Sequence, residues 1–255
     1  MGRIDINCDM GESFGVYDIG GDDEALLDLV SSANVACGFH AGDPRIIDRT
    51  VALAARHHVA VGAHPSHHDL RGFGRREMKV SPEEVEADVV YQVGAVLAFA
   101  RAHGVPLVHV KPHGALYNQA VNDEALARAI ARGVRRVSAD LIFVGLATSK
   151  AMRGAAEAEG LRFAGEAFAD RVYNPDGTLQ SRRIQGSVIT DPGKAAKQAV
   201  EIATARQVTA HDGAVVPLDA QTLCLHGDNK AALENARAVR RALEEKGLEI
   251  KGLSA

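Results

Sequence analysis

The sequence predicts an α/β fold, a TIM-like (β/α) barrel of about seven parallel strands. Short apolar runs alternate with amphipathic helical segments along the whole chain. The regularity of this alternation favours a closed barrel over the alternative, an open doubly wound sheet. Several apolar runs end in histidine and a turn, as expected where the carboxyl ends of parallel strands gather polar side chains.

Capping signals mark the predicted helices. Asp43-Pro44 and Asp191-Pro192 each place a capping carboxylate before a proline at the first helical position. Ser81 begins a capping box with Glu84. The predicted helices cover residues 43–57, 81–104, 122–137, 149–160, 191–206 and 228–247. The predicted strands between them cover residues 4–8, 35–38, 59–63, 107–110, 141–145, 162–166 and 222–225.

Size and composition fit one α/β barrel, with two small domains as the alternative. The chain has 255 residues, 46% of them hydrophobic, which suffices for a single barrel spanning residues 1–255. The formal net charge of -4 argues against a nucleic-acid surface. No apolar stretch approaches the ~20 residues that span a bilayer, and the N-terminus does not resemble a signal peptide. Three widely spaced cysteines suit reduced thiols, so we expect a cytoplasmic protein whose cysteines are small buried residues.

Two polar segments interrupt the alternation and follow predicted strands. Residues 66–79 contain Gly-Phe-Gly-Arg-Arg, and residues 170–190 contain a turn signal with hairpin-like flanks. Because both follow strand ends, we expect both loops to cover substrate at the site face. The alternative is that they are ordinary surface loops.

The first predicted strand carries polar side chains on one face. Alternation places Asp5, Asn7 and Asp9 opposite the apolar Ile4 and Ile6. Burying these groups without partners costs several kcal/mol, so they should meet cations, donors or a metal. For Asp5, deep in the strand, we predict a structural salt bridge. For Asp9 and Glu12, near the strand end, we predict a role in the site.

Histidines at successive strand ends suggest a metal. Asp9, His40 and His64 follow three consecutive strands, and one carboxylate with two imidazoles can hold a divalent ion. Such an ion would acidify bound water and polarise a carbonyl group. Histidine at a strand end can equally serve as a general base or a hydrogen-bond donor.

Further candidates follow later strands. Lys111 and His113 suit an anionic group such as a carboxylate or phosphate, although Lys111 could instead neutralise Asp9 or Glu12. Glu166 could be a general base and Arg171 a carboxylate clamp, or both could belong to a salt-bridged rim. His226 ends the last predicted strand, and Asp228 after it caps a helix.

Common catalytic signatures are missing from the sequence. It contains no P-loop, no G-x-S-x-G elbow and no G-x-G-x-x-G after the first strand. Spacing alone therefore identifies neither an ATP site nor a dinucleotide site.

Several long motifs resemble the LamB/YcsF family. The resemblance covers essentially the whole chain in order. It rests on DINCDMGESFG (5–15), SANVACGFHAGDP (32–44), GAHPSHHDLRGFGRR (62–76), HVKPHGALYN (109–118), EAFADRVY (166–173) and LHGDN (225–229). The resemblance implies a distorted barrel related to metal-dependent polysaccharide deacetylases. It also raises the expectation that Asp9, His40 and His64 form a present or former metal site.

The resemblance further implies the activity of that family's A subunit of ATP-dependent 5-oxoprolinase. The expected reaction opens the lactam of 5-oxoproline to glutamate with ATP cleavage, together with separate subunits B and C. On this basis Asp9 or Glu166 would be the base, and His40, His64 or His113 the acid or oxyanion stabiliser. Asn7, Glu12, Lys111, Arg171 and His226 would bind substrate or phosphate.

Two other functions remain open from the sequence. One is a metal-dependent amidohydrolase or deacetylase that acts alone without ATP. The other is a non-catalytic subunit that binds substrate while its partners do the chemistry.

Overall fold

The computed structural model describes residues 2–18, 22–225 and 232–254. Within these ranges, seven parallel strands close into a ring in the order β1-β2-β3-β4-β5-β6-β9, and β9 pairs back to β1. The strands are β1 (Arg3–Met10), β2 (Ser32–Ala36), β3 (Ala60–His64), β4 (Leu107–Val110), β5 (Ile142–Leu146), β6 (Arg162–Phe168) and β9 (Thr222–Leu225). The predicted TIM-like barrel is confirmed, and closure excludes the open sheet.

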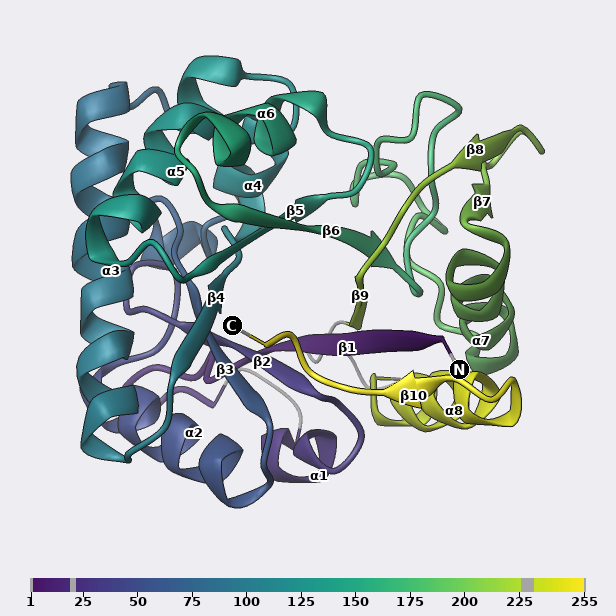
Figure 1. Ribbon diagram of the computed structural model, residues 1–255, viewed down its shortest axis with the longest axis horizontal. Coiled ribbons are helices and arrows are strands. Elements are labelled where there is room, and N and C mark those ends of the chain that lie inside the picture. Colours follow the sequence, from purple (N-terminus) through teal and green to yellow (C-terminus); the bar gives the residue numbers. More distant parts are fainter. Residues whose placement is uncertain (1, 19–21, 226–231, 255) are drawn as a thin grey trace.

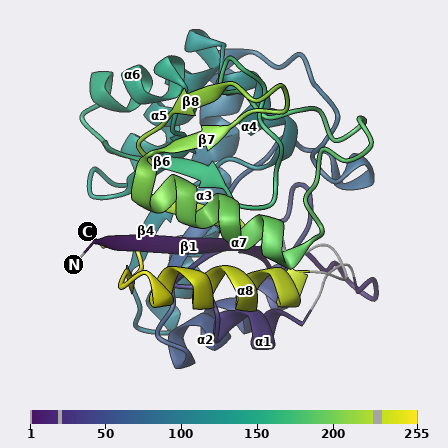
Figure 2. The same cartoon turned by 90° about the vertical axis from the view of Figure 1, so that its right-hand side faces the viewer.

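Helices surround this ring of strands (Figure 1). α2, α3, α5 and α6 cover one part of its outside, while α7 and α8 pack against each other beside β1 and lie side by side in Figure 2. Their bounds are α1 (Asp23–Leu27), α2 (Pro44–Arg56), α3 (Pro82–Ala102), α4 (Gly114–Ala120), α5 (Glu124–Val137), α6 (Lys150–Ala158), α7 (Pro192–Val200) and α8 (Ala232–Glu245). Short helices η1 (Leu70–Gly72) and η2 (Glu201–Ala205) complete the helical elements of the described residues.

The predicted caps form as the sequence indicates. The Asp43 carboxylate accepts hydrogen bonds from the backbone N–H groups of Arg45 and Ile46 at the start of α2. Ser81 and Glu84 form the reciprocal capping box of α3. Each cap satisfies backbone donors that would otherwise lack partners in the first helical turn.

Some predicted boundaries are wrong. The strand predicted at 35–38 begins at Ser32 and ends at Ala36, because the polar Ser32 and Asn34 point into the barrel and find partners there. The short α1 and α4, the antiparallel pair β7 (Gln207–Thr209) and β8 (Val215–Pro217), and β10 (Glu249–Ile250) were not predicted. The predicted start of the last helix at Asp228 lies outside the described residues.

The core lies between the ring of strands and the helices, and it buries apolar side chains such as Ile6, Val35, Phe143 and Leu223. Cys8, Cys37 and Cys224 are buried free thiols, as expected. Among the described residues, no helix is both long and apolar enough to cross a membrane.

Candidate metal and hydrolytic site

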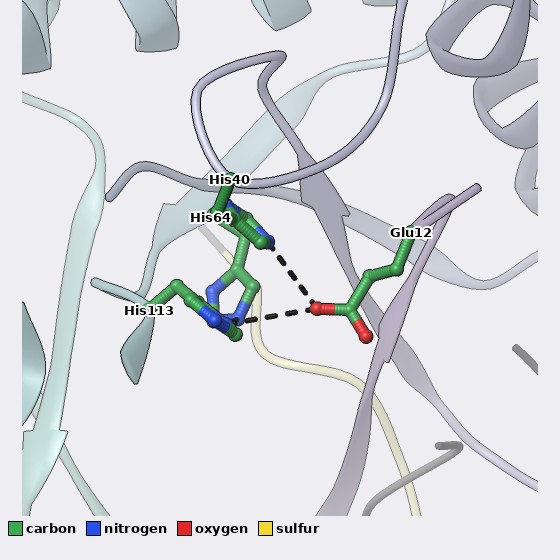
Figure 3. A group of neighbouring side chains, drawn as sticks. All are labelled: Glu12, His40, His64 and His113. Carbon is green, nitrogen blue, oxygen red and sulfur yellow. Dashed lines mark hydrogen bonds and ion pairs between the residues drawn. The ribbon is translucent and has the colours of Figure 1, made fainter. Parts of the chain in front are cut away.

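Four side chains meet at the carboxyl ends of the strands. Glu12 follows β1, His40 follows β2, His64 ends β3 and His113 follows β4. One potential ligand atom from each of them lies within 4.8 Å of those of the others. All four are buried, and the Glu12 carboxylate points at the three rings from the β1 side (Figure 3).

The imidazole rings are held in fixed orientations. The His40 and His113 rings stack with centroids 3.8 Å apart and nearly parallel planes. The His64 ring stands edge-on to both of them. Glu12 Oε1 lies 3.2 Å from His40 Nε2 and 3.6 Å from His113 Nδ1.

Hydrogen bonds behind each ring assign its tautomer. His64 Nδ1 donates to the Lys111 carbonyl oxygen at 2.7 Å, and His113 Nε2 donates to the Phe73 carbonyl oxygen at 2.9 Å. The Ser66 hydroxyl donates to the His67 carbonyl oxygen, so it accepts from His40 Nδ1 at 3.1 Å. Each neutral ring therefore presents a lone pair to the common centre.

Those lone pairs favour a bound cation. His64 Nε2 and His113 Nδ1 lie 3.0 Å apart, yet neither neutral ring has a hydrogen left for the other. Burial, and then repulsion from a neighbouring imidazole, lowers the pKa of His40 and of His113 well below the usual range. A shared proton is thus disfavoured, whereas a divalent metal accepts neutral imidazoles and a carboxylate. Oxygen atoms behind each ring are also the usual support of metal-binding histidine.

Asp9 lies beside this cluster and not within the group of four. Its Oδ2 lies 3.3 Å from His64 Nε2, and its Oδ1 lies 2.8 Å from Lys111 Nζ. Its carboxylate also accepts a hydrogen bond from Asn34. The metal ligands expected from sequence were Asp9, His40 and His64. The structure brings these three close together and adds Glu12 and His113.

Lys111 is buried and surrounded by acceptors. Its Nζ lies 2.8 Å from Asp9 Oδ1, 3.1 Å from Asn7 Oδ1 and 3.0 Å from Glu166 Oε1. Cys224 Sγ lies 3.2 Å away. Burial alone would lower the pKa of Lys111, but the Asp9 and Glu166 carboxylates raise it well above its usual range. An ammonium has three N–H donors, so these contacts favour the neutralising role for Lys111 over substrate binding.

Asp5 does not form the predicted salt bridge. Its carboxylate accepts hydrogen bonds from the hydroxyls of Ser31, Ser32 and Thr222, and among the described residues it pairs with no cation. Burial raises its pKa to about 6. Thr222 also accepts from Asn7, which links Asp5 to the groups around Lys111. The predicted salt bridge is wrong because hydroxyl groups of the neighbouring strands already satisfy the carboxylate.

A cavity of about 1100 Å³ opens above these groups. Asp9, His64, Lys111 and His113 line it, together with residues of both loops, 66–79 and 170–190. Both loops therefore lie at the site face, where they were expected. The green segment between β6 and α7 lies on the side toward which β1 runs (Figure 2).

The other residues predicted for the site lie in different parts of the barrel and its loops, or outside the described residues. Glu166 is fully buried behind Lys111, and Asn7 is buried inside the barrel. Arg171 lines the cavity, but it also donates to the carbonyl oxygens of Gln180 and Ser187 and so holds loop 170–190. His226 lies outside the described residues.

Sequence reasoning missed several supporting residues. Gln92 on α3 holds the backbone of Ser66 through two hydrogen bonds, and Ser66 in turn orients His40. Asn34 on β2 bonds Asn7, Asp9 and His109. A polar residue within an apolar run, as at Asn34, is the signal that could have identified this partner.

A parallel α/β barrel with a buried histidine–carboxylate cluster that could hold a divalent metal, at the carboxyl ends of its strands, has the architecture of an enzyme. The LamB/YcsF family model matches residues 4–255, and the chain belongs to that family.

Three similar proteins agree with this assignment. The chain is 50% identical over 253 residues to the A subunit of 5-oxoprolinase from Natranaerobius thermophilus, covering 99% of this chain and 98% of that protein. It is 51% identical over 253 residues to the protein of the same name from Tolumonas auensis, covering 99% and 100%. A lactam utilization protein from Thermus thermophilus superposes with a TM-score of 0.92 at 50% identity, covering 98% of this chain and 99% of that one.

Proposed function

We propose that this chain is the A subunit of a 5-oxoprolinase and hydrolyses the lactam of 5-oxo-L-proline to L-glutamate. The names and near-complete overlap of its relatives support the assignment. The observation that carries the chemistry is the buried cluster of Glu12, His40, His64 and His113, of which His64 and His113 line the cavity. Residues 1–255 act as one catalytic domain in this proposal.

A divalent metal held by those four residues is part of the proposal. When bound, such an ion polarises a carbonyl group and lowers the pKa of nearby water. The inward lone pairs of His40, His64 and His113 suit ligands better than proton donors.

Asp9 is the proton carrier in our mechanism. It lines the cavity, whereas the alternative base Glu166 is fully buried behind Lys111. Lys111 contacts both carboxylates and fixes Asp9 Oδ1 at 2.8 Å, with Oδ2 beside His64. Asp9 takes a proton from the attacking water and returns it to the ring nitrogen.

ATP cleavage activates the amide in this scheme. The lactam oxygen forms a bond to the γ-phosphorus of ATP as the bond to ADP breaks. Water then adds to the ring carbon, and the carbon–nitrogen bond breaks as the nitrogen is protonated. A second water releases phosphate from the resulting acyl phosphate and leaves glutamate. Subunits B and C take part in this ATP-dependent reaction.

We also place the protein in the cytoplasm. The three cysteines are free thiols, and reducing compartments maintain that state.

Reconstitution tests the proposed function. The purified chain, 5-oxoproline and ATP are mixed with and without subunits B and C, and glutamate and phosphate are measured. We expect glutamate only with all components, and Asp9→Asn should lower turnover by about 10²-fold or more. His211→Ala, an exposed histidine away from the cavity, is the matched control.

Other outcomes would support the other functions. Hydrolysis by the chain alone without ATP would identify a stand-alone amidohydrolase. Full activity of the complex with Asp9→Asn and His64→Ala would overturn our proposal and leave this chain the role of binding substrate for its partners.

A further inference from the structure

The deepest cation of the cavity has little capacity left for an anionic ligand. Lys111 already contacts Asp9, Asn7, Glu166 and Cys224 through a group with three donors. A phosphoryl group entering the cavity must therefore find its positive partners elsewhere.

The two loops at the mouth supply such partners. Arg75 and Arg76 come from loop 66–79, and Arg182 and Arg183 come from loop 170–190. All four guanidinium groups belong to exposed side chains that line the same cavity. The Asp69 carboxylate pairs with Arg76 and offsets its charge, so this arginine adds little to the positive potential of the mouth.

Contacts with neighbouring residues hold the loops that carry these arginines. Arg171 donates to the carbonyl oxygens of Gln180 and Ser187, on either side of Arg182 and Arg183. Arg75 stacks over the Phe73 ring at 4.9 Å, and the Phe73 carbonyl oxygen accepts from His113. Guanidinium groups on fixed loops are well suited to bind phosphate through paired hydrogen bonds.

The charge and size of the cavity fit a phosphorylated ligand. Among its described lining residues, six carry arginine or lysine side chains and three carry carboxylates (Asp9, Glu77 and Asp176), while the Asp69 and Glu166 carboxylates behind this lining offset Arg76 and Lys111. The volume of about 1100 Å³ also exceeds what a small lactam would fill. A single carboxylate on the lactam would not use this many cations.

We infer that Arg182 and Arg183, with Arg75 across the cavity, bind a phosphoryl group above the histidine cluster. The group belongs either to ATP or to a phosphorylated lactam that reaches this site. This inference rests on the proposed function for the identity of the ligand, but the binding of phosphate can be measured without it.

Calorimetric titration of the full chain, freed of metal by chelation, tests the inference with inorganic phosphate and with ATP as probes. We expect Arg182→Gln/Arg183→Gln to weaken phosphate binding at least about tenfold, a change of ~1.4 kcal/mol. The matched control is Arg101→Gln/Arg135→Gln, two exposed arginines on the outer helices α3 and α5. Binding of ATP about tenfold or more tighter than phosphate identifies the nucleotide as the source. Equal binding identifies a phosphorylated lactam.

Two results would overturn the inference. One is a wild-type chain that binds neither probe at millimolar concentration, and the other is a double variant that binds both as the wild type does. Turnover of the double variant in the complex separates the two proposals. Normal turnover there counts against the arginines alone, whereas phosphate binding without glutamate formation counts against the proposed function alone.

Discussion

The surroundings of a buried ionisable group in the barrel change its pKa, as at Asp5. Asp5 lies at the bottom of a chain of polar side chains that passes through Thr222 and Asn7 to Lys111. Three hydroxyl donors satisfy its carboxylate, but they do not fully offset its desolvation. The surroundings of Asp5 therefore favour the neutral carboxylic acid over the carboxylate.

The stability of the folded protein should therefore depend on pH through Asp5. Because the pKa of Asp5 rises from 3.8 to about 6 on folding, the folded state binds this proton more tightly than the unfolded state. The resulting contribution is complete below pH 3.8 and is lost as pH rises through about 6. It amounts to roughly 3 kcal/mol at most.

Urea unfolding between about pH 4 and pH 8 measures this contribution. The difference in unfolding free energy between wild type and Asp5→Asn should grow in favour of wild type as pH falls. Ser32→Ala, which keeps the carboxyl group, should retain the slope. A pH-independent difference for Asp5→Asn would contradict the account.

Sequence reasoning found most residues of the site but not their pairing. The rule that strand ends carry site residues identified His40, His64 and His113, which meet in one cluster, and Lys111, which contacts Asp9 beside it. It could not show that Glu12 faces the histidines. Gly11 adopts a φ of 69° after β1, so the alternation that orients Asp9 no longer applies at Glu12.

At the scale of elements, close helix packing supports the barrel. Gly133 on α5 lies against α3, where an added Cβ would meet Val89 at 2.8 Å and the Glu86 carbonyl oxygen at 2.9 Å. Gly94 on α3 has nothing within 4 Å of the same added atom. A side chain added at Gly133 would therefore clash with α3, whereas one added at Gly94 would have room.

Alanine substitutions at these two positions should have opposite effects. Gly94→Ala should raise the free energy of unfolding by about 1 kcal/mol through helix propensity. Gly133→Ala gains the same propensity but forces α3 and α5 apart, so we expect a net loss of roughly 1–3 kcal/mol. Chemical denaturation of both variants measures the difference, and equal stabilisation would show that the helices are not tightly packed here.

Long elements were predictable, and short ones were not. Capping signals and apolar periodicity identified α2, α3 and α5 within one or two residues. β10 has two residues and β7 and β8 have three each, which is too short for any period to show. The position of β10 depends on pairing with a distant segment, Arg3 with Glu249, whereas β7 and β8 pair with each other.

At the scale of the whole molecule, the proposed metal joins parts of the chain far apart in sequence. Its four ligands follow or end β1, β2, β3 and β4, so binding requires these strands to be in register. A ligand that binds only the folded state stabilises it by mass action.

Zinc should therefore raise the melting temperature of the chelator-treated chain. At about 100 times the dissociation constant the gain is ~2.7 kcal/mol, or roughly 5–10 °C for a chain of this size. Differential scanning calorimetry measures it without any assay of activity. His64→Ala should abolish the rise and His211→Ala should keep it. The same rise in both variants would place the ion elsewhere.

The pairing of β10 with the start of β1 has a practical consequence. It brings both ends of the described chain to the amino-terminal side of the strands, whereas the cavity opens at the carboxyl side. An affinity tag or surface tether attached at either end would therefore leave from the far side of the barrel. Immobilised protein should keep its entrance accessible to small molecules and to other subunits.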